Sequence, residues 1–184
     1  MQKSTVKLVA ELSRLLLAFV ALVNAFERKQ PQALLQLTNW IAEAEALLSA
    51  YGHVSAAELA GQRSKLLQPV YQDDRRGSLR KHQLALAVTM LFDLQATLQN
   101  ALAPYQQKLQ QSRELILHLL SVIRQSGALH YADAAGFEHF VQQLWQLIGQ
   151  HDQLKASAVQ LRSWLSEQDV LLLLAEEVNP ADFT

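Results

Sequence analysis

The chain has 184 residues, a formal net charge of −1 and no cysteine, which excludes disulfides, thiolate metal sites and a cysteine nucleophile. Because the chain is nearly neutral, only a local basic patch could attract nucleic acid or an anionic membrane. Leucine and glutamine dominate, whereas the aromatic and β-branched residues that favour strands are sparse. This composition predicts an all-helical protein, and a chain of this length is expected to form a single domain over residues 1–184.

The first predicted helix runs from about Thr5 to Arg28 and is capped by Ser4. Its centre, Leu15 to Val23, is wholly apolar and follows basic residues, which is the outline of a secretory signal. Glu11 in the preceding segment argues against a signal, and the nine apolar residues are too few to span a bilayer. We expect a buried core helix with no membrane role and keep the signal as the alternative.

Two shorter helices are expected next. Pro31 is at a first-turn position and opens a helix that ends near Ala50. The residues Ser55 to Glu58 match a capping box, in which a hydroxyl and a carboxylate each satisfy a backbone N–H at the start of the third helix. The polar residues 69–78 are then expected to form a mobile loop between this N-terminal three-helix part and the remaining helices.

The residues Leu79 to Ser126 form the predicted central helix, because they contain no glycine and place apolar residues at steps of three, four and seven. Pro104 lies inside this segment, and a proline in a helix interior costs about 3 kcal/mol. An unbroken helix would reach roughly 70 Å, whereas a compact domain of this size is about 40 Å across. Since the apolar pattern crosses Pro104 in register, we expect a sharp bend there, with two antiparallel helices as the alternative.

The C-terminal part is also expected to be helical. Asp133 is a plausible N-cap for a helix that carries Phe137 and is expected to continue through Gly149 to Trp164. Ser166 can cap a short last helix, and the tail beyond that helix should be irregular. The predicted fold is therefore an all-α, largely antiparallel bundle of about six or seven helices around the bent central helix.

Metal and cofactor chemistry has little support in the sequence. Di-iron sites in helical bundles need Glu-x-x-His spacing on several helices, and this spacing does not occur in the chain. Glu114 and His118 share one helical face, but two ligands do not make a site. No phosphate-binding glycine loop, catalytic carboxylate pair or serine nucleophile motif is visible. We therefore predict no metal, no other cofactor and no enzymatic activity.

The segment from Arg113 to His118 resembles the Arg-x4-His signature of the HEPN-type ribonucleases, which are helical and generally dimeric. The resemblance implies that the arginine stabilises phosphate charge and that the histidine transfers a proton. This chain has Glu114 where the family has a small polar residue, and a carboxylate there would repel RNA. Residues five apart also lie about 140° from each other around an ideal helix. A solvated arginine and a boundary histidine are the competing interpretation.

The residues from His151 to Ser157 resemble the motif of histidine phosphotransfer domains. In that family leucine and lysine follow the histidine by two and three positions and a glycine comes next. Here Leu154 and Lys155 follow by three and four positions, and Ala156 replaces the glycine. The added methyl group would crowd a phosphorylated imidazole, so we do not expect this activity.

One basic cluster lies on the predicted loop and at the start of the central helix, and it consists of Arg75, Arg76, Arg80, Lys81 and His82. Such a cluster could contact several phosphates. Asp73 and Asp74 precede it directly, and the interleaved aromatic residues that would stack on bases are lacking. Three interpretations remain, namely a solvated loop, a partner-binding or regulatory surface, and a nucleic-acid site.

The function favoured by the sequence is a non-enzymatic helical interaction, adaptor or regulatory protein of bacterial type. A short terminal helix cannot bury four consecutive leucines against one neighbour, so Leu171, Leu172, Leu173 and Leu174 are the predicted partner interface. A protein partner is expected, with a homo-oligomer favoured, and the absence of cysteine is compatible with a cytoplasmic location. A nucleic-acid-binding regulator is the first alternative and a HEPN-like ribonuclease the second.

Overall fold

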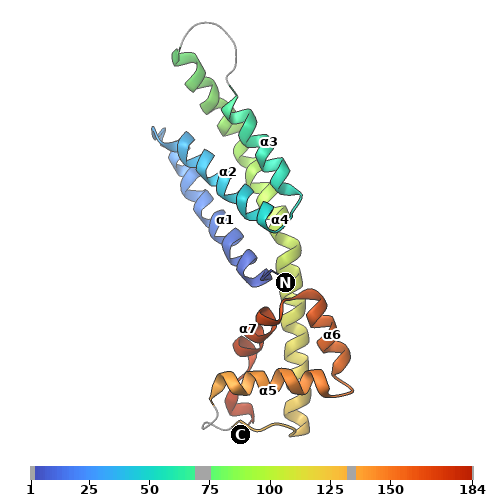
Figure 1. Ribbon diagram of the computed structural model, residues 1–184. Helices are drawn as coiled ribbons and strands as arrows, with labels where there is room; N and C mark the ends of the chain where they lie inside the picture. The colour runs from blue at the N-terminus through green and yellow to red at the C-terminus, as the bar shows by residue number, and fades with distance from the viewer. Residues whose placement is uncertain (1–2, 69–75, 132–135, 184) are drawn as a thin grey trace. The chain divides into compact units, whose positions relative to one another are not determined.

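The structure is a computed structural model that describes residues 3–68, 76–131 and 136–183 (Figure 1). These residues contain helices and turns and no strand, which confirms the all-α prediction. The elements are α1 (Thr5–Glu27), α2 (Ala33–Ala50), α3 (Ser55–Leu67), α4 (Arg76–Ser126), α5 (Phe137–Gln150), α6 (Lys155–Trp164) and α7 (Glu167–Glu177), followed by the short 3-10 helix η2 (Pro180–Phe183).

The chain forms two compact units, which we describe separately. Unit 1 comprises Met1–Lys7 and Tyr105–Thr184, and unit 2 comprises Leu8–Pro104. The boundary falls at Pro104, whereas the sequence suggested a division at the loop of residues 69–78. Residues 69–75 of that loop lie outside the described part of the chain. The single domain expected from the length stays a prediction.

Unit 2 is built from α1, α2, α3 and the part of α4 before Pro104. Short turns join the first three helices, so that the chain direction alternates from one helix to the next (Figure 1). The helix α2 packs directly against α3. The core of this unit is almost purely aliphatic, and its fully buried side chains include Leu12, Leu15, Leu37, Ile41, Leu48, Leu59, Leu94 and Leu98.

The apolar run of α1 is only partly buried. Leu15 and Phe19 are 1% exposed, whereas Leu17 is 76% and Val20 is 60% exposed. A continuous apolar run in a helix has no polar side, so the packing of its neighbours decides which half of it is covered, as where Trp40 of α2 contacts Leu15 and Phe19. The expectation of a buried core helix therefore holds for one face of α1. Among the described helices, none is both long enough and apolar enough to cross a membrane.

The capping box expected at residues 55–58 is wrong. The N-cap of α3 is Val54, whose side chain makes no capping hydrogen bond, and the Ser55 backbone N–H instead donates to His53 Nδ1 at 3.2 Å. The Glu58 carboxylate instead accepts a hydrogen bond from Thr97 Oγ1 of α4 at 2.9 Å. The Glu58 carboxylate therefore bonds to a residue distant in sequence instead of to the backbone N–H of its own helix start.

The helix α4 continues through Pro104, so the alternative of two antiparallel helices is wrong. It begins at Arg76, three residues before the predicted start at Leu79. The apolar steps predict an inner face made by Leu84, Val88, Leu91, Leu98, Leu102, Tyr105, Leu109, Ile116, Leu119 and Ile123. From Leu98 onward these residues are buried, except for the half-buried Tyr105. Val88, however, is 55% exposed, and Ala87 and Met90 occupy the buried positions of that turn. The bend expected at Pro104 stays a prediction.

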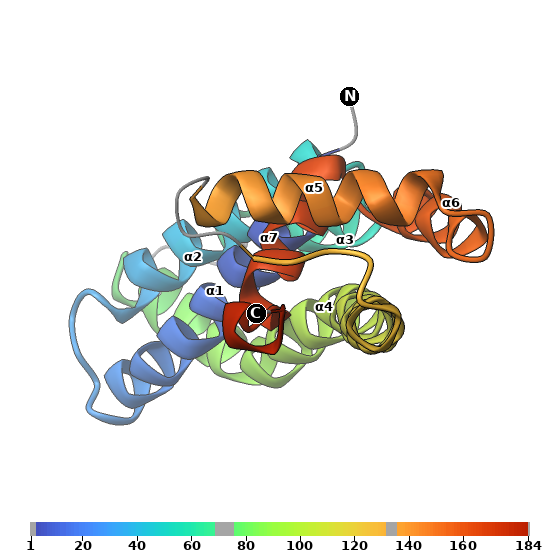
Figure 2. The same ribbon diagram turned by 90° about the horizontal axis from the view of Figure 1, so that it is seen from below.

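Unit 1 consists of the first turn of α1, up to Lys7, and the C-terminal part of α4 together with α5, α6, α7 and η2. The axis of α5 runs across that of α4, and α5 contacts both α6 and α7 (Figures 1 and 2). The ring of Phe140 contacts those of Tyr131 and Phe183, with centroids 5.1 and 5.4 Å apart. The expected irregular tail is wrong, because residues 180–183 form η2 and bury Phe183.

The helix expected to continue through Gly149 to Trp164 is interrupted. The helix α5 ends at Gln150, and His151 adopts an extended conformation with ψ of 123°. Its carbonyl then accepts hydrogen bonds from the backbone N–H groups of Leu154 and Lys155, both at 2.9 Å, which turn the chain into α6. The N-cap predicted at Asp133 lies outside the described residues.

Both serine caps are confirmed, and one of them is joined to a buried carboxylate. Ser166 Oγ accepts from the backbone N–H of Asp169 at 3.2 Å, and Ser4 Oγ accepts from that of Lys7 at 3.0 Å. The Asp169 side chain, which is on α7, accepts from Ser4 Oγ at 2.5 Å and from the Thr5 backbone N–H at 2.7 Å. Asp169 is 2% exposed, so the first turn of α1 is held to α7 by a buried charge.

Candidate functional site

A groove runs between α1 and α2 in unit 2, and we call it the α1–α2 groove. Its volume is about 610 Å³. The α1 side is lined by small side chains and Leu22, and the α2 side carries Trp40 and polar residues. The lining residues that matter below are Arg14, Ala18, Ala21, Leu22, Ala25, Arg28, Gln36, Asn39, Trp40 and Glu43.

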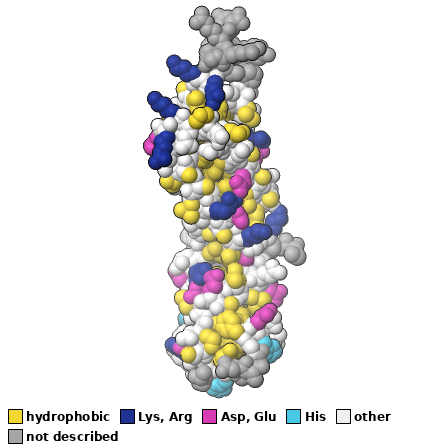
Figure 3. Space-filling model, turned by 90° about the vertical axis from the view of Figure 1, so that its left-hand side faces the viewer, with side chains coloured by type: hydrophobic (Ala, Val, Ile, Leu, Met, Phe, Trp, Pro, Cys, Tyr) yellow, Lys and Arg dark blue, Asp and Glu magenta, His cyan; other side chains and the backbone are white. Residues whose placement is uncertain are grey.

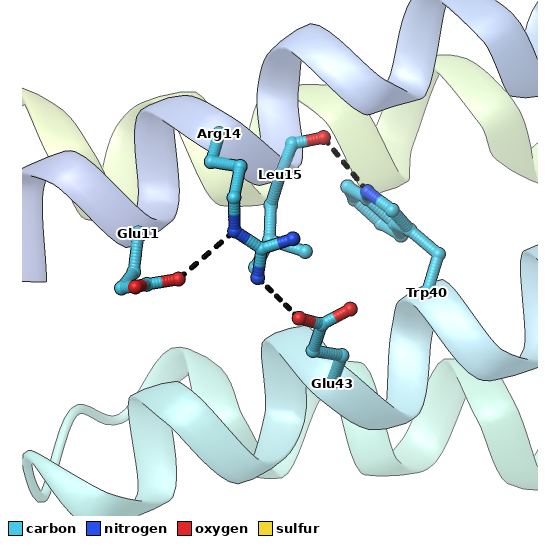
Figure 4. Close-up of polar contacts among 5 residues, drawn as sticks. All are labelled: Glu11, Arg14, Leu15, Trp40 and Glu43. Carbon is cyan, nitrogen blue, oxygen red and sulfur yellow. Dashed lines mark hydrogen bonds and ion pairs between the residues drawn. The ribbon is translucent and has the colours of Figure 1, made fainter.

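The floor of the α1–α2 groove is centred on Trp40. The indole N–H donates a hydrogen bond to the carbonyl of Leu15 at 2.8 Å (Figure 4). The ring also contacts that of Phe19, with centroids 4.8 Å apart. Trp40 is 4% exposed and its one donor is satisfied, so it closes the bottom of the groove and offers no hydrogen bond to an occupant.

One end of the α1–α2 groove holds one guanidinium and two carboxylates. The Arg14 guanidinium pairs with Glu43 of α2 and with Glu11 of its own helix (Figure 4). Hydrogen bonds to Glu43 and then to Glu11 raise the pKa of Arg14 above its ordinary value. All three side chains are substantially exposed, so this network positions charges more than it adds to stability.

The other end of the α1–α2 groove is basic. Arg28 lines it, and Lys29 follows in the turn to α2 with a positive φ of 53°. Arg80 of α4 reaches this turn, because its guanidinium donates to the carbonyl of Pro31 at 2.7 Å. On the face drawn in Figure 3, Lys and Arg side chains gather near the upper end of the picture, where this turn lies.

The predicted basic cluster is therefore placed only in part. Arg80, Lys81 and His82 are exposed in the first turns of α4. The side chains of Arg75 and Arg76 lie outside the described part of the structure. The contact between Arg80 and Pro31 adds Arg28 and Lys29 of α1 and its turn to the same end of unit 2.

A second groove lies between α5 and α7 in unit 1, and we call it the α5–α7 groove. It has a volume of about 390 Å³ and mostly apolar walls made by Phe137, Val141, Leu171, Leu172 and Ala175. Glu138 is its only charged lining residue in the described part of the chain, and Gln142 and Gln168 are its polar ones. All its lining residues belong to α5 and α7 of unit 1, so the packing of these two helices forms its walls.

The structure separates the four leucines of the predicted partner interface. Leu173 and Leu174 are 0% exposed and belong to the core of unit 1. Leu172 is 44% exposed, and Leu171 is half-buried beside it on the wall of the α5–α7 groove. Four consecutive residues cover the whole circumference of a helix, so one side of α7 packs inward and the other faces outward.

Arg113 and His118 have different surroundings. The Arg113 guanidinium donates to Glu177 and Glu176 of α7, each at 2.5 Å, whereas His118 is exposed. Partial burial alone would lower the pKa of Arg113, but the hydrogen bonds to the two carboxylates outweigh it, and the pKa is raised from its ordinary value. An arginine bound by two carboxylates lies in a negative environment, which is unfavourable for a phosphate.

The two remaining candidates are the phosphotransfer histidine and a metal site, and the described residues give little support to either. His151 is exposed at the end of α5, and its Nδ1 accepts from the backbone N–H of Gln153 at 3.3 Å. Within residues 3–68, 76–131 and 136–183, no group of three or more His, Asp or Glu side chains could hold a metal ion.

The residues that the sequence analysis missed are those of the α1–α2 groove and Phe137 and Val141 of the α5–α7 groove. The sequence does carry a signal for the α1–α2 groove, because its lining residues Arg14, Ala18, Ala21, Ala25 and Arg28 recur at steps of four and three. The uninterrupted apolar run obscured this second face of α1. No match was found when the chain was compared with protein-family models, with curated protein sequences and with solved structures, so its function has to be inferred from its residues.

Proposed function

We propose that this chain is a non-enzymatic helical interaction module that self-associates through the α5–α7 groove. The observation that carries the proposal is the exposed apolar wall formed by Leu172 and Phe137, which are 44% and 38% exposed beside a hollow. A two-fold contact brings equivalent patches together, so that each charge approaches the like charge of the other copy. A patch with a single carboxylate and two glutamines is suited to such a contact, because little charge has to be buried.

Leu172→Ser should weaken self-association at least tenfold without unfolding the protein. Each substitution removes apolar surface from both sides of a two-fold interface, and two partly buried leucines contribute about 2 kcal/mol. Sedimentation equilibrium over a range of protein concentrations measures the change. The matched control is Leu117→Ser, since Leu117 is 48% exposed on α4 of the same unit and does not line the groove.

An unchanged dimer constant in Leu172→Ser, or a wild-type protein that stays monomeric at high concentration, would exclude this mode of self-association. The cytoplasmic location expected from the sequence is a separate prediction and does not depend on this result.

A nucleic-acid-binding regulator is the second candidate function. It is favoured by one observation, namely that Arg28 and Lys29 lie at the same end of unit 2 as Arg80. The ribonuclease hypothesis has less support, because the guanidinium of Arg113 is already bound by Glu176 and Glu177.

The double substitution Lys29→Glu and Lys81→Glu should lower the affinity for a labelled oligonucleotide about tenfold or more if this end of unit 2 binds phosphates. Fluorescence anisotropy at several salt concentrations measures the effect, and the salt dependence of binding should become shallower. Lys155→Glu, an exposed position on α6, is the control. Equal affinities of the double variant and the wild type would eliminate the nucleic-acid function at this surface.

A further inference from the structure

We infer that the α1–α2 groove binds one amphipathic helix of a partner protein, with carboxylates on the helix turn that lies over Arg28. This inference concerns unit 2 and is independent of self-association through unit 1. It is carried by three features of the groove, which are its length, the exposed alanines on its α1 side and the difference in charge between its two ends.

The dimensions of the α1–α2 groove fit a helix. Its lining extends along α1 from Arg14 to Arg28, which corresponds to about 21 Å or four helical turns. Ala18 and Ala21 are exposed on this side, and such small side chains let another backbone approach closely. A helix lying in a groove between two helices buries its apolar face without needing a free sheet edge.

The walls of the α1–α2 groove select an apolar occupant with a polar outer face. Trp40 has no free donor, because its N–H is bonded to the Leu15 carbonyl. Ala18 and Ala21 are the exposed apolar residues of the α1 side, so an occupant meets small side chains there. The rim on α2 carries the uncharged Gln36 and Asn39, which can hydrogen-bond to the outer face of a bound helix.

The charge at the two ends sets the chemistry of the partner. At one end Arg14 pairs with two carboxylates, those of Glu11 and Glu43. In the described part of the chain, Arg28 at the other end forms no ion pair. An occupant that places carboxylates there gains ion pairs, whereas one with lysines would be repelled. The negative end of a helix dipole would also be favoured at Arg28.

The other occupants fit less well. In a second copy of the chain, the same surface is a hollow lined by alanines, so a two-fold contact would leave the space unfilled. Nucleic acid would match the basic end but not the exposed alanines of α1 or the two carboxylates beside Arg14. A partner helix is the occupant that uses the whole length of the groove.

The test uses the full chain to select binding peptides from a displayed library of helical peptides, each about sixteen residues long. The library fixes one apolar face of alanine and leucine and allows Glu, Gln or Lys equally at the outer positions. We expect enrichment of peptides with Glu confined to one terminal turn. The enriched peptide should bind at least tenfold more weakly to Arg28→Glu in fluorescence anisotropy. Reversing its glutamates to lysine should restore binding to that variant.

A second variant separates the groove from the charge. Ala21→Trp fills the groove at an exposed position, and Ala57→Trp, an exposed alanine on α3, is its matched control. Binding of the enriched peptide should be lost in Ala21→Trp and retained in Ala57→Trp. Circular dichroism and thermal unfolding verify that each variant is folded.

Four outcomes would overturn the inference. They are a selection with no enrichment over an unrelated helical protein, enrichment of lysine-rich peptides, peptide binding that Ala21→Trp leaves unchanged, and a dimer that Ala21→Trp alone disperses. Oligonucleotide binding that depends on Arg28 but not on Ala21 would assign the basic end to nucleic acid instead. Failure of Leu172→Ser to alter the oligomeric state would contradict only the proposed self-association, because that residue lies in unit 1.

Discussion

Leu173→Ala is expected to lower the free energy of unfolding by about 2–5 kcal/mol, whereas Leu172→Ala, one residue earlier, should cost about 1 kcal/mol or less. Leu173 is 0% exposed and Leu172 is 44% exposed. Truncation of a buried leucine loses the transfer free energy of its methyl groups and leaves a cavity, because the close-packed surroundings relax only in part. Truncation of an exposed leucine leaves no cavity.

Urea unfolding followed by circular dichroism measures both values at a protein concentration where the oligomeric state is the same. Leu174→Ala, which is also 0% exposed, should behave like Leu173→Ala. Similar losses for Leu172 and Leu173 would show that α7 is rotated about its axis relative to the description given above. Comparison of Leu172→Ala with Leu173→Ala thus distinguishes a leucine available to a partner from a leucine of the core.

Asp169→Ala is expected to destabilise the protein by about 2–4 kcal/mol. The Asp169 carboxylate accepts hydrogen bonds from Ser4 Oγ and from the Thr5 N–H, and it is itself buried. Its removal leaves the Thr5 N–H, at a residue that is 7% exposed, without its acceptor. The substitution also removes a negative charge from the N-terminal turns of two helices, where the helix dipoles favour it.

Asp152→Ala is the matched control for Asp169→Ala, since Asp152 is exposed in the turn between α5 and α6. Its stability should remain within about 0.5 kcal/mol of the wild type. Hydrogen exchange should show that the amides of the first turn of α1 exchange faster in Asp169→Ala. A stability equal to that of the wild type would mean that the interaction between α1 and α7 does not persist in solution.

Features that depend on local chemistry were predictable from the sequence. The scarcity of strand-favouring residues and the three- and four-residue apolar spacing predicted an all-α fold, and the structure confirms it. Ser4 and Ser166 were recognised as caps because a hydroxyl can satisfy a backbone N–H within its own turn. These interactions span a few residues, so the sequence contains all the information they need.

Features that depend on competing partners were not predictable. Glu58 matches a capping box, but Thr97, which is 39 residues away, provides the hydrogen bond that the carboxylate makes. The helix was expected to continue through Gly149, yet the chain turns at His151 so that α6 can pack against α5. In both cases a contact distant in sequence outweighed a local preference of about 1 kcal/mol.

The sequence by itself determined the helical class, most helix boundaries and the two serine caps. Only the tertiary structure decided which side of each apolar helix is covered, and the candidate sites depend on that choice. The run Leu15–Val23 and the leucines 171–174 are apolar all round, so their composition distinguishes no inner face. Packing buries Leu15, Phe19, Leu173 and Leu174, whereas it leaves Leu17 exposed and Leu172 on the wall of the α5–α7 groove. A surface for a partner therefore arises where the apolar residues of a helix exceed what its neighbours can cover.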